Sequence, residues 1–78
     1  MITTILIVED EPALRRSLER NLTKFFSEGL TLHLAGSVKQ ALEVCAKNEI
    51  DLIFLDINLP DGTGFDVLDQ ISTSDEHP

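Results

Sequence analysis

Carboxylates stand at the ends of two short apolar runs in this sequence. Residues 5–8 lead directly into an acidic triplet at residues 9–11, and residues 52–55 lead into Asp56. A buried strand that stops at a carboxylate delivers it to the rim of a sheet, where open parallel α/β sheets bind ligands. Carboxylates gathered there repel one another unless a cation lies between them, and an all-oxygen ligand set suits a hard ion such as Mg²⁺. The pattern therefore predicts a divalent-metal site.

The size and charge of the chain limit the kinds of protein it can be. Its 78 residues form at most one small domain, and 42% hydrophobic with 26% charged residues is typical of a chain that folds. The net charge is −8, and the chain has six Lys and Arg residues in all. Nucleic-acid contact within this segment is therefore not expected, since phosphate contacts need clustered basic side chains. Metal ions and basic protein surfaces are better matches.

Cys45 and the N-terminal apolar run bear on the compartment. Cys45 cannot form an internal disulfide and lies among apolar residues at helical spacing, which is typical of a reduced core thiol. The N-terminal run is too short for a membrane span or for the apolar part of a signal peptide, and no basic region precedes it. We therefore expect a cytoplasmic protein without membrane contact.

Hydrophobic periodicity predicts three strands. They are expected at residues 3–9, 30–35 and 51–56. The second alternates apolar and polar residues, which indicates an edge strand with one wetter face. The third has four consecutive apolar residues, so both of its faces are expected to be covered by helices.

The first helix carries start and stop signals and an apolar stripe. Asp10 or Glu11 can cap it, Pro12 fits its first turn, and Gly29 supplies a left-handed stop. Apolar residues then repeat at three- and four-residue spacing. They are Leu14, Leu18, Leu22, Phe25 and Phe26. The stripe is expected to pack against the sheet as core.

The order strand, helix, strand, helix, strand, helix indicates right-handed parallel crossovers. A capping box at residues 37–40 opens the second helix, and the third follows a turn-forming loop at residues 59–64. The expected fold is α/β, a flavodoxin-like doubly wound parallel sheet truncated to about three strands and three helices. In that fold the first and third strands are neighbours, about 4.8 Å apart, which brings Asp10 and Asp56 together.

Four segments match one known family in both residues and spacing. They are residues 5–12 (ILIVEDEP), residues 51–56 (DLIFLD), the pair Leu59-Pro60, and Gly64. With these motifs the chain resembles the N-terminal part of a response-regulator receiver domain, the phospho-acceptor of two-component signalling. Residues 1–78 are therefore interpreted as part of a single receiver domain whose fourth and fifth strands are absent.

The resemblance implies a role for each acid. Asp56 is the residue phosphorylated, Glu9 and Asp10 are the acidic pair, and the backbone carbonyl of Asn58 completes the protein ligands of Mg²⁺. Asp10 is expected to bind the metal directly and Glu9 through water, whereas Glu11 is interpreted as a charge that complements the helix dipole. The donor is a sensor histidine kinase or a phosphotransfer protein. The chain is thus expected to be a signalling acceptor and not an enzyme.

Three other interpretations fit parts of the sequence. A Mg²⁺-dependent phosphatase of haloacid-dehalogenase type has its nucleophilic Asp two residues before an Asp-Gly-Thr, but this chain has Leu59 before residues 61–63. A nucleotide-binding fragment needs a glycine-rich turn after the first strand, where acids stand instead. A non-catalytic α/β interaction fragment would use the acids only as solvated caps and turn residues. Turnover of a generic phosphate ester would identify the phosphatase.

The chain departs from a complete receiver in ways that affect function. The resemblance implies a Ser or Thr ending a fourth strand and a Lys ending a fifth, and neither Thr63 nor Lys47 is expected to replace them. The segment is therefore expected to be defective as a switch. Residues 52–55 are also too apolar for an exposed strand edge, so a homodimer through the third strand is expected.

Overall fold

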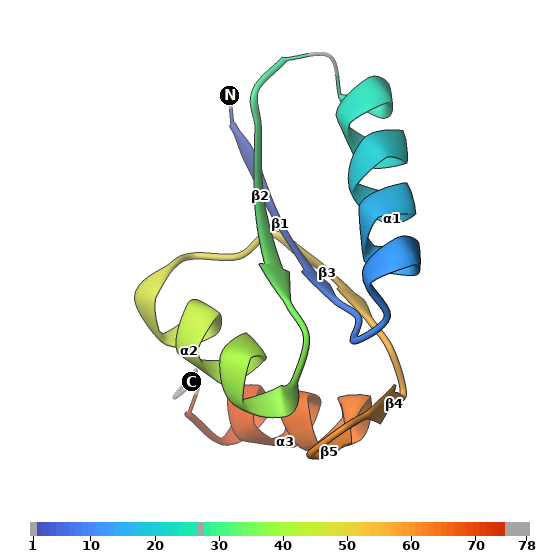
Figure 1. The fold of residues 1–78 in the computed structure, drawn as a ribbon. Coiled ribbons are helices and arrows are strands. Elements are labelled where there is room, and N and C mark those ends of the chain that lie inside the picture. Colours follow the sequence, from blue (N-terminus) through green and yellow to red (C-terminus); the bar gives the residue numbers. More distant parts are fainter. Residues whose placement is uncertain (1, 27, 75–78) are drawn as a thin grey trace.

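A three-stranded parallel sheet forms the centre of the fold (Figure 1). The structure is a computed structural model that describes residues 2–26 and 28–74. The strands, in the order β2-β1-β3, are β1 (Thr3–Val8), β2 (Leu30–Ala35) and β3 (Leu52–Leu55). The helices are α1 (Pro12–Phe25), α2 (Val38–Lys47) and α3 (Gly64–Ser74). The predicted α/β fold and the adjacency of the first and third strands are confirmed.

A short antiparallel hairpin connects β3 to α3. Its strands are β4 (Asn58–Leu59) and β5 (Gly62–Thr63). The sequence predicted only a turn-forming loop here, but the two-residue connection at residues 60–61 brings the flanking backbones close enough to pair. These strands form a sheet of their own and do not extend the sheet of β1, β2 and β3.

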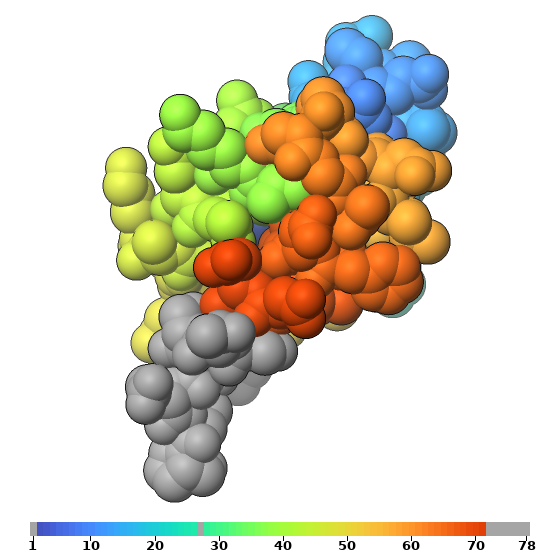
Figure 2. Space-filling model, turned by 90° about the horizontal axis from the view of Figure 1, so that it is seen from below, coloured from blue at the N-terminus to red at the C-terminus, as the bar shows by residue number. Residues whose placement is uncertain are grey.

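The main core lies between the sheet and the pair of helices α2 and α3. Leu6 and Val8 of β1 are fully buried there with Ala41 of α2 and Val67 of α3. Figure 2 looks onto α3 and shows it beside α2, with which it packs. Burying an aliphatic side chain of this size contributes roughly 1.5–3 kcal/mol. This packing fixes the central strand, whose carboxyl end leads into the acidic triplet.

α1 covers the opposite face of the sheet only in part. It packs mainly against β1 and β2, and none of its residues is buried. Leu18 and Leu22 are half-buried, but Leu14 is 50% exposed and Phe25 is 80% exposed. The prediction that the whole stripe is core is therefore wrong. One helix about 10 Å wide spans roughly two strands at a spacing of about 4.8 Å.

β3 is less buried than its apolar sequence predicted. Leu52 is 46% exposed and the other three residues are half-buried, so the prediction of two covered faces is wrong. The reason is the position of β3 in the sheet. Among the described residues only β1 pairs with it, and α1 lies over the other two strands.

The boundary signals of α1 act at slightly different positions than predicted. Pro12 is the first helical residue, as expected, but Glu11 occupies the capping position without a side-chain capping bond. The helix ends at Phe25, whereas Gly29, with φ of 72°, serves the turn into β2. No helix in the two described ranges is long and apolar enough to cross a membrane.

Candidate functional site

Three carboxylates predicted to meet do lie together at the carboxyl end of the sheet. Glu9, Asp10 and Asp56 each offer one oxygen atom, and these atoms all lie within 4.8 Å of one another. The parallel register aligns Val8 of β1 with Leu55 of β3, so the residue that follows each strand reaches the same edge. Glu9 and Asp56 are half-buried and Asp10 is exposed. We refer to these three residues as the acidic cluster.

Glu9 is held by hydrogen bonds on both sides of its backbone. Its N–H donates to the Ala35 carbonyl at 2.9 Å, and its carbonyl accepts from the Arg15 guanidinium at 2.9 Å. The Glu9 carboxylate accepts the Glu11 N–H at 3.2 Å, and Glu11, at the N-cap, makes no side-chain capping bond of its own. Arg15 was missed because its acceptor is a backbone carbonyl, and no side-chain pattern in the sequence marks such an acceptor.

Asp56 is anchored to β1 and to the segment that follows it. Its N–H donates to the Val8 carbonyl at 3.0 Å, and its Oδ1 accepts the Asn58 N–H at 3.3 Å. Gly64 lies close to the Asp56 backbone, and its N–H donates to the Ile57 carbonyl at 2.9 Å. A Cβ atom at Gly64 would lie 2.5 Å from the Asp56 carbonyl oxygen, so only glycine allows this approach.

The ionised form of Glu9 is disfavoured by its surroundings in the acidic cluster. Burial raises the pKa of the Glu9 carboxyl above its ordinary value, and the charges of Asp56 and Asp10 raise this pKa further, against the Glu11 hydrogen bond, which lowers it. Oxygen donors that repel one another in this way gain stability when a hard cation binds. The donor set therefore fits Mg²⁺.

The other residues singled out in the sequence lie outside the acidic cluster. Asn58 begins β4 and is joined to Asp56 through its N–H. Thr63 Oγ1 accepts the Asp66 N–H at 3.3 Å at the start of α3, and Lys47 lies in the last turn of α2. The latter two residues thus have structural positions elsewhere, in agreement with the sequence interpretation.

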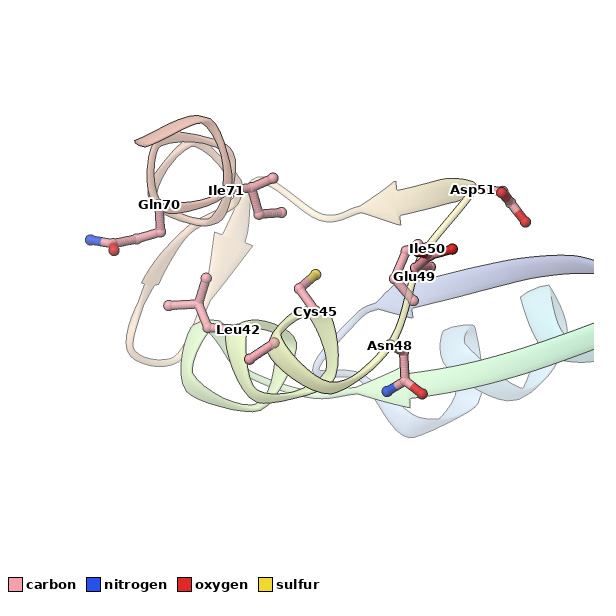
Figure 3. A pocket seen from close by; sticks show the side chains of 9 residues that line it. Leu42, Cys45, Asn48, Glu49, Ile50, Asp51, Gln70 and Ile71 are labelled. Carbon is pink, nitrogen blue, oxygen red and sulfur yellow. The ribbon is translucent and has the colours of Figure 1, made fainter. Parts of the chain in front are cut away.

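Cys45 lines a cavity of about 650 Å³ between α2, α3 and the start of β3 (Figure 3). Leu42, Ile50 and Ile71 also line it. Asp51, which also lines the cavity, precedes β3, whereas Asp56 follows this strand. The cavity therefore lies at the opposite end of β3 from Asp56. Burial raises the pKa of the Cys45 thiol. A half-buried thiol of this kind is a poor nucleophile, which supports the interpretation as a structural residue.

Comparison with known proteins agrees with this geometry. Residues 5–78 match the family model of the response regulator receiver domain. The chain is 40% identical over 73 residues to the response regulator protein PilR of Pseudomonas aeruginosa. It is 39% identical over 67 residues to the KDP operon transcriptional regulatory protein KdpE of Escherichia coli. The chain therefore belongs to the response-regulator receiver domain family.

A solved response-regulator structure has a similar fold. The response regulator TrrA of Thermotoga maritima, in complex with Mg²⁺ and BeF, has a TM-score of 0.82 and 30% sequence identity. The match covers 92% of this chain and 60% of TrrA. The match to PilR covers 94% of this chain and 15% of PilR, and the match to KdpE covers 86% of this chain and 28% of KdpE. The chain thus spans less than a third of the length of PilR and of KdpE.

Replacing Glu9 with Gln is expected to raise the free energy of unfolding of the metal-free protein at pH 7, because the folded state penalises the ionised carboxylate. The gain should shrink as the pH falls through the raised pKa toward the ordinary value of 4.5, since wild-type Glu9 then binds a proton in the folded state. Urea denaturation with a chelator present measures this. Glu49→Gln, at an exposed position, is the control, and an equal gain there would contradict the explanation.

Proposed function

We propose that this chain is the phospho-acceptor segment of a two-component response regulator, with Asp56 as the acceptor. The observation that carries the proposal is the position of Asp56 at the end of β3, beside Glu9 and Asp10. In the transfer, an Asp56 carboxylate oxygen bonds to the phosphorus of a phosphohistidine. The P–N bond breaks, and its electron pair stays on the imidazole nitrogen of the donor.

The residues around Asp56 divide the work of binding in this proposal. Asp10, Asp56 and the backbone carbonyl of Asn58 would hold Mg²⁺ directly, and Glu9 would hold it through water. When bound, the ion neutralises charge on the phosphoryl oxygens. The Asn58 N–H orients the Asp56 carboxylate through its bond to Oδ1, and the half-buried position of Asp56 limits access of water.

The product of this step stays attached to the chain, so we propose an acceptor and not an enzyme. The donor would be a sensor histidine kinase or a phosphotransfer protein in the cytoplasm. The haloacid-dehalogenase alternative has two structural arguments against it. Leu59, at the position of that family's nucleophile, is buried in the hairpin, and Asp61 bonds to the backbone of α2. The interaction-fragment alternative predicts neither a bound metal nor an aspartyl phosphate.

Mg²⁺ is expected to bind weakly, with amide shifts at residues 9–11 and 56–58 in an NMR titration. Asp10→Asn should abolish most of the binding, because it removes a charged ligand from the acidic cluster. Glu11→Gln is the matched control, since Glu11 is adjacent in sequence but is not part of the cluster. Shifts confined to other regions, or an equal loss in both variants, would contradict the proposed ligand set.

Phosphorylation of the 78-residue chain by a phosphoramidate with Mg²⁺ is expected to be slow and confined to Asp56. The reason is electrostatic: the resemblance assigns part of the stabilisation to a Lys, and we do not expect Lys47, in the last turn of α2, to replace it. Intact mass spectrometry of the wild type and of Asp56→Asn measures the adduct. An adduct that survives Asp56→Asn, or multiple turnovers of a phosphate ester, would refute the acceptor role. A rate equal to that of TrrA would refute the expected slowing.

We also propose that the 78-residue chain forms a homodimer through β3. Among the described residues no strand pairs with its outer edge, and Leu52 there is 46% exposed. Such an edge is a template for another strand. Pairing of two β3 strands across a two-fold axis would satisfy both edges in a closed contact. Exchange of α3 between chains is the main variant of this arrangement.

Phe54→Lys is expected to convert the dimer to a monomer, because it places a charge on the strand that forms the contact. Light scattering after size-exclusion chromatography reports the mass. Phe25→Lys, at a position on α1 that is 80% exposed, should remain dimeric. A folded wild-type monomer at high concentration would show that β3 does not mediate self-association.

A further inference from the structure

The hairpin at residues 58–63 contacts the start of α2 at a point outside the acidic cluster. The Asp61 carboxylate accepts two backbone N–H groups, from Val38 at 2.7 Å and from Lys39 at 3.1 Å. The hairpin and the first turn of α2 lie side by side in both overall views (Figures 1 and 2). Because the hairpin begins with Asn58, this contact joins α2 to the segment that follows Asp56.

The first turn of α2 depends on the hairpin for acceptors. N–H groups in the first turn of a helix lack intrahelical partners. Ser37 Oγ accepts the Gln40 N–H at 3.1 Å, which confirms the predicted capping residue. Asp61 accepts the Val38 and Lys39 N–H groups, and its negative charge suits the positive end of the helix dipole. Both hydrogen bonds lower the pKa of the Asp61 carboxyl, and the bond from Val38 has the larger effect.

The rest of the hairpin is packed tightly between α2 and α3. A Cβ atom at Gly62 would lie 2.6 Å from Asp66 Oδ2 and 3.1 Å from Val38 Cγ2. Thr63 and Asp66 exchange hydrogen bonds: the Thr63 N–H donates to Asp66 Oδ2 at 2.9 Å, and the Asp66 N–H donates to Thr63 Oγ1 at 3.3 Å. The hairpin is therefore tied to α3 at its base and to α2 at its tip.

We propose that Asp61 is a positioning residue for the phospho-acceptor site, which it serves by anchoring the hairpin so that Asn58 is held beside Asp56. Strands of two residues are too short to be stable alone. Asn58 is exposed and its strand partner in the two-residue pairing is Thr63, so its backbone gains from support by a neighbouring element. The α2 backbone supplies that support through Asp61. This inference rests on the proposed function, since it concerns ligands of the same site.

The coupling makes α2 sensitive to what binds at the acidic cluster. A shift of Asn58 toward a bound ion must move the hairpin, and the Asp61 carboxylate transmits this movement to the amides of Val38 and Lys39. We therefore expect Mg²⁺ to perturb these two amides although they belong to α2. Asp61→Ala should remove that perturbation and weaken Mg²⁺ binding about tenfold, the lower end of the range for groups that position metal ligands.

NMR titration of the 78-residue chain with Mg²⁺ tests the proposal, with amide hydrogen exchange of the metal-free protein as a second measurement. Asp61→Ala should speed exchange of the Asn58 and Gly64 amides, both of which bond within residues 56–64. Asp61→Asn keeps one acceptor oxygen and should show the same effects to a smaller extent. This variant tests the proposal if Asp61→Ala does not fold. Ser37→Ala removes a cap of α2 without touching the hairpin and should leave Mg²⁺ affinity unchanged. Glu28→Gln controls for the loss of one negative charge.

Three results would overturn the inference. The first is unchanged exchange at Asn58 and Gly64 in Asp61→Ala, which would show that the contact does not hold the hairpin. The second is faster exchange in Asp61→Ala with unchanged Mg²⁺ affinity. The third is an equal loss of Mg²⁺ affinity in Ser37→Ala or Glu28→Gln. Failure of the wild type to bind Mg²⁺ would refute the proposed function and the positioning of a metal ligand with it. Because amide exchange is measured on the metal-free protein, it tests whether Asp61 anchors the hairpin even if the wild type does not bind Mg²⁺.

Discussion

Parallel pairing of β1 with β3, in a register that aligns Val8 with Leu55, decides where the acids meet. The residue after each strand then lies at the same edge of the sheet, and Asp56 donates its N–H to the Val8 carbonyl. Any other neighbour for β3 would separate Asp56 from Glu9 and Asp10 by at least a further strand spacing. The buried face formed with α2 and α3 maintains this pairing, so the core and the acidic cluster depend on the same interaction.

The acidic cluster opposes the stability of the fold that creates it. Glu9 is partly removed from water and faces the charges of Asp56 and Asp10, which raises its pKa. The hydrogen bonds that hold Glu9 in place involve backbone groups: Arg15 donates to the Glu9 carbonyl, and the Glu11 N–H donates to the Glu9 carboxylate. These bonds fix the position of Glu9 without neutralising its carboxylate. The negative charge thus remains available for a cation, as the proposed acceptor chemistry requires.

The helices cover the two faces of the sheet unevenly. Leu6 and Val8 on the face with α2 and α3 are completely buried, as are Ile5 and Ile7 of the same strand. The difference lies in the helices, because α1 has no buried residue and leaves Leu14 and Phe25 exposed. The hairpin connects α2 to Asp56, because Asn58 bonds to Asp56 and Asp61 bonds to the first turn of α2. The hairpin is thus a direct structural connection between Asp56 and α2. Among the described residues β2 and β3 are the two edge strands of this sheet, and each has one edge without a partner strand.

The sequence by itself determined the element order, the meeting of Glu9, Asp10 and Asp56, and the family. Strand periodicity is a local property, and a flavodoxin-like order of the doubly wound sheet, once expected, places the first and third strands side by side. Tertiary structure alone decided the bonds of Arg15 to Glu9 and of Asp61 to α2, and the exposure of Leu52. The Arg15 and Asp61 bonds involve backbone groups, which no side-chain pattern marks, and the exposure of Leu52 depends on which strands a helix covers. The meeting of the acids could be predicted because it follows from strand order, whereas their support depends on how the loops and helices pack.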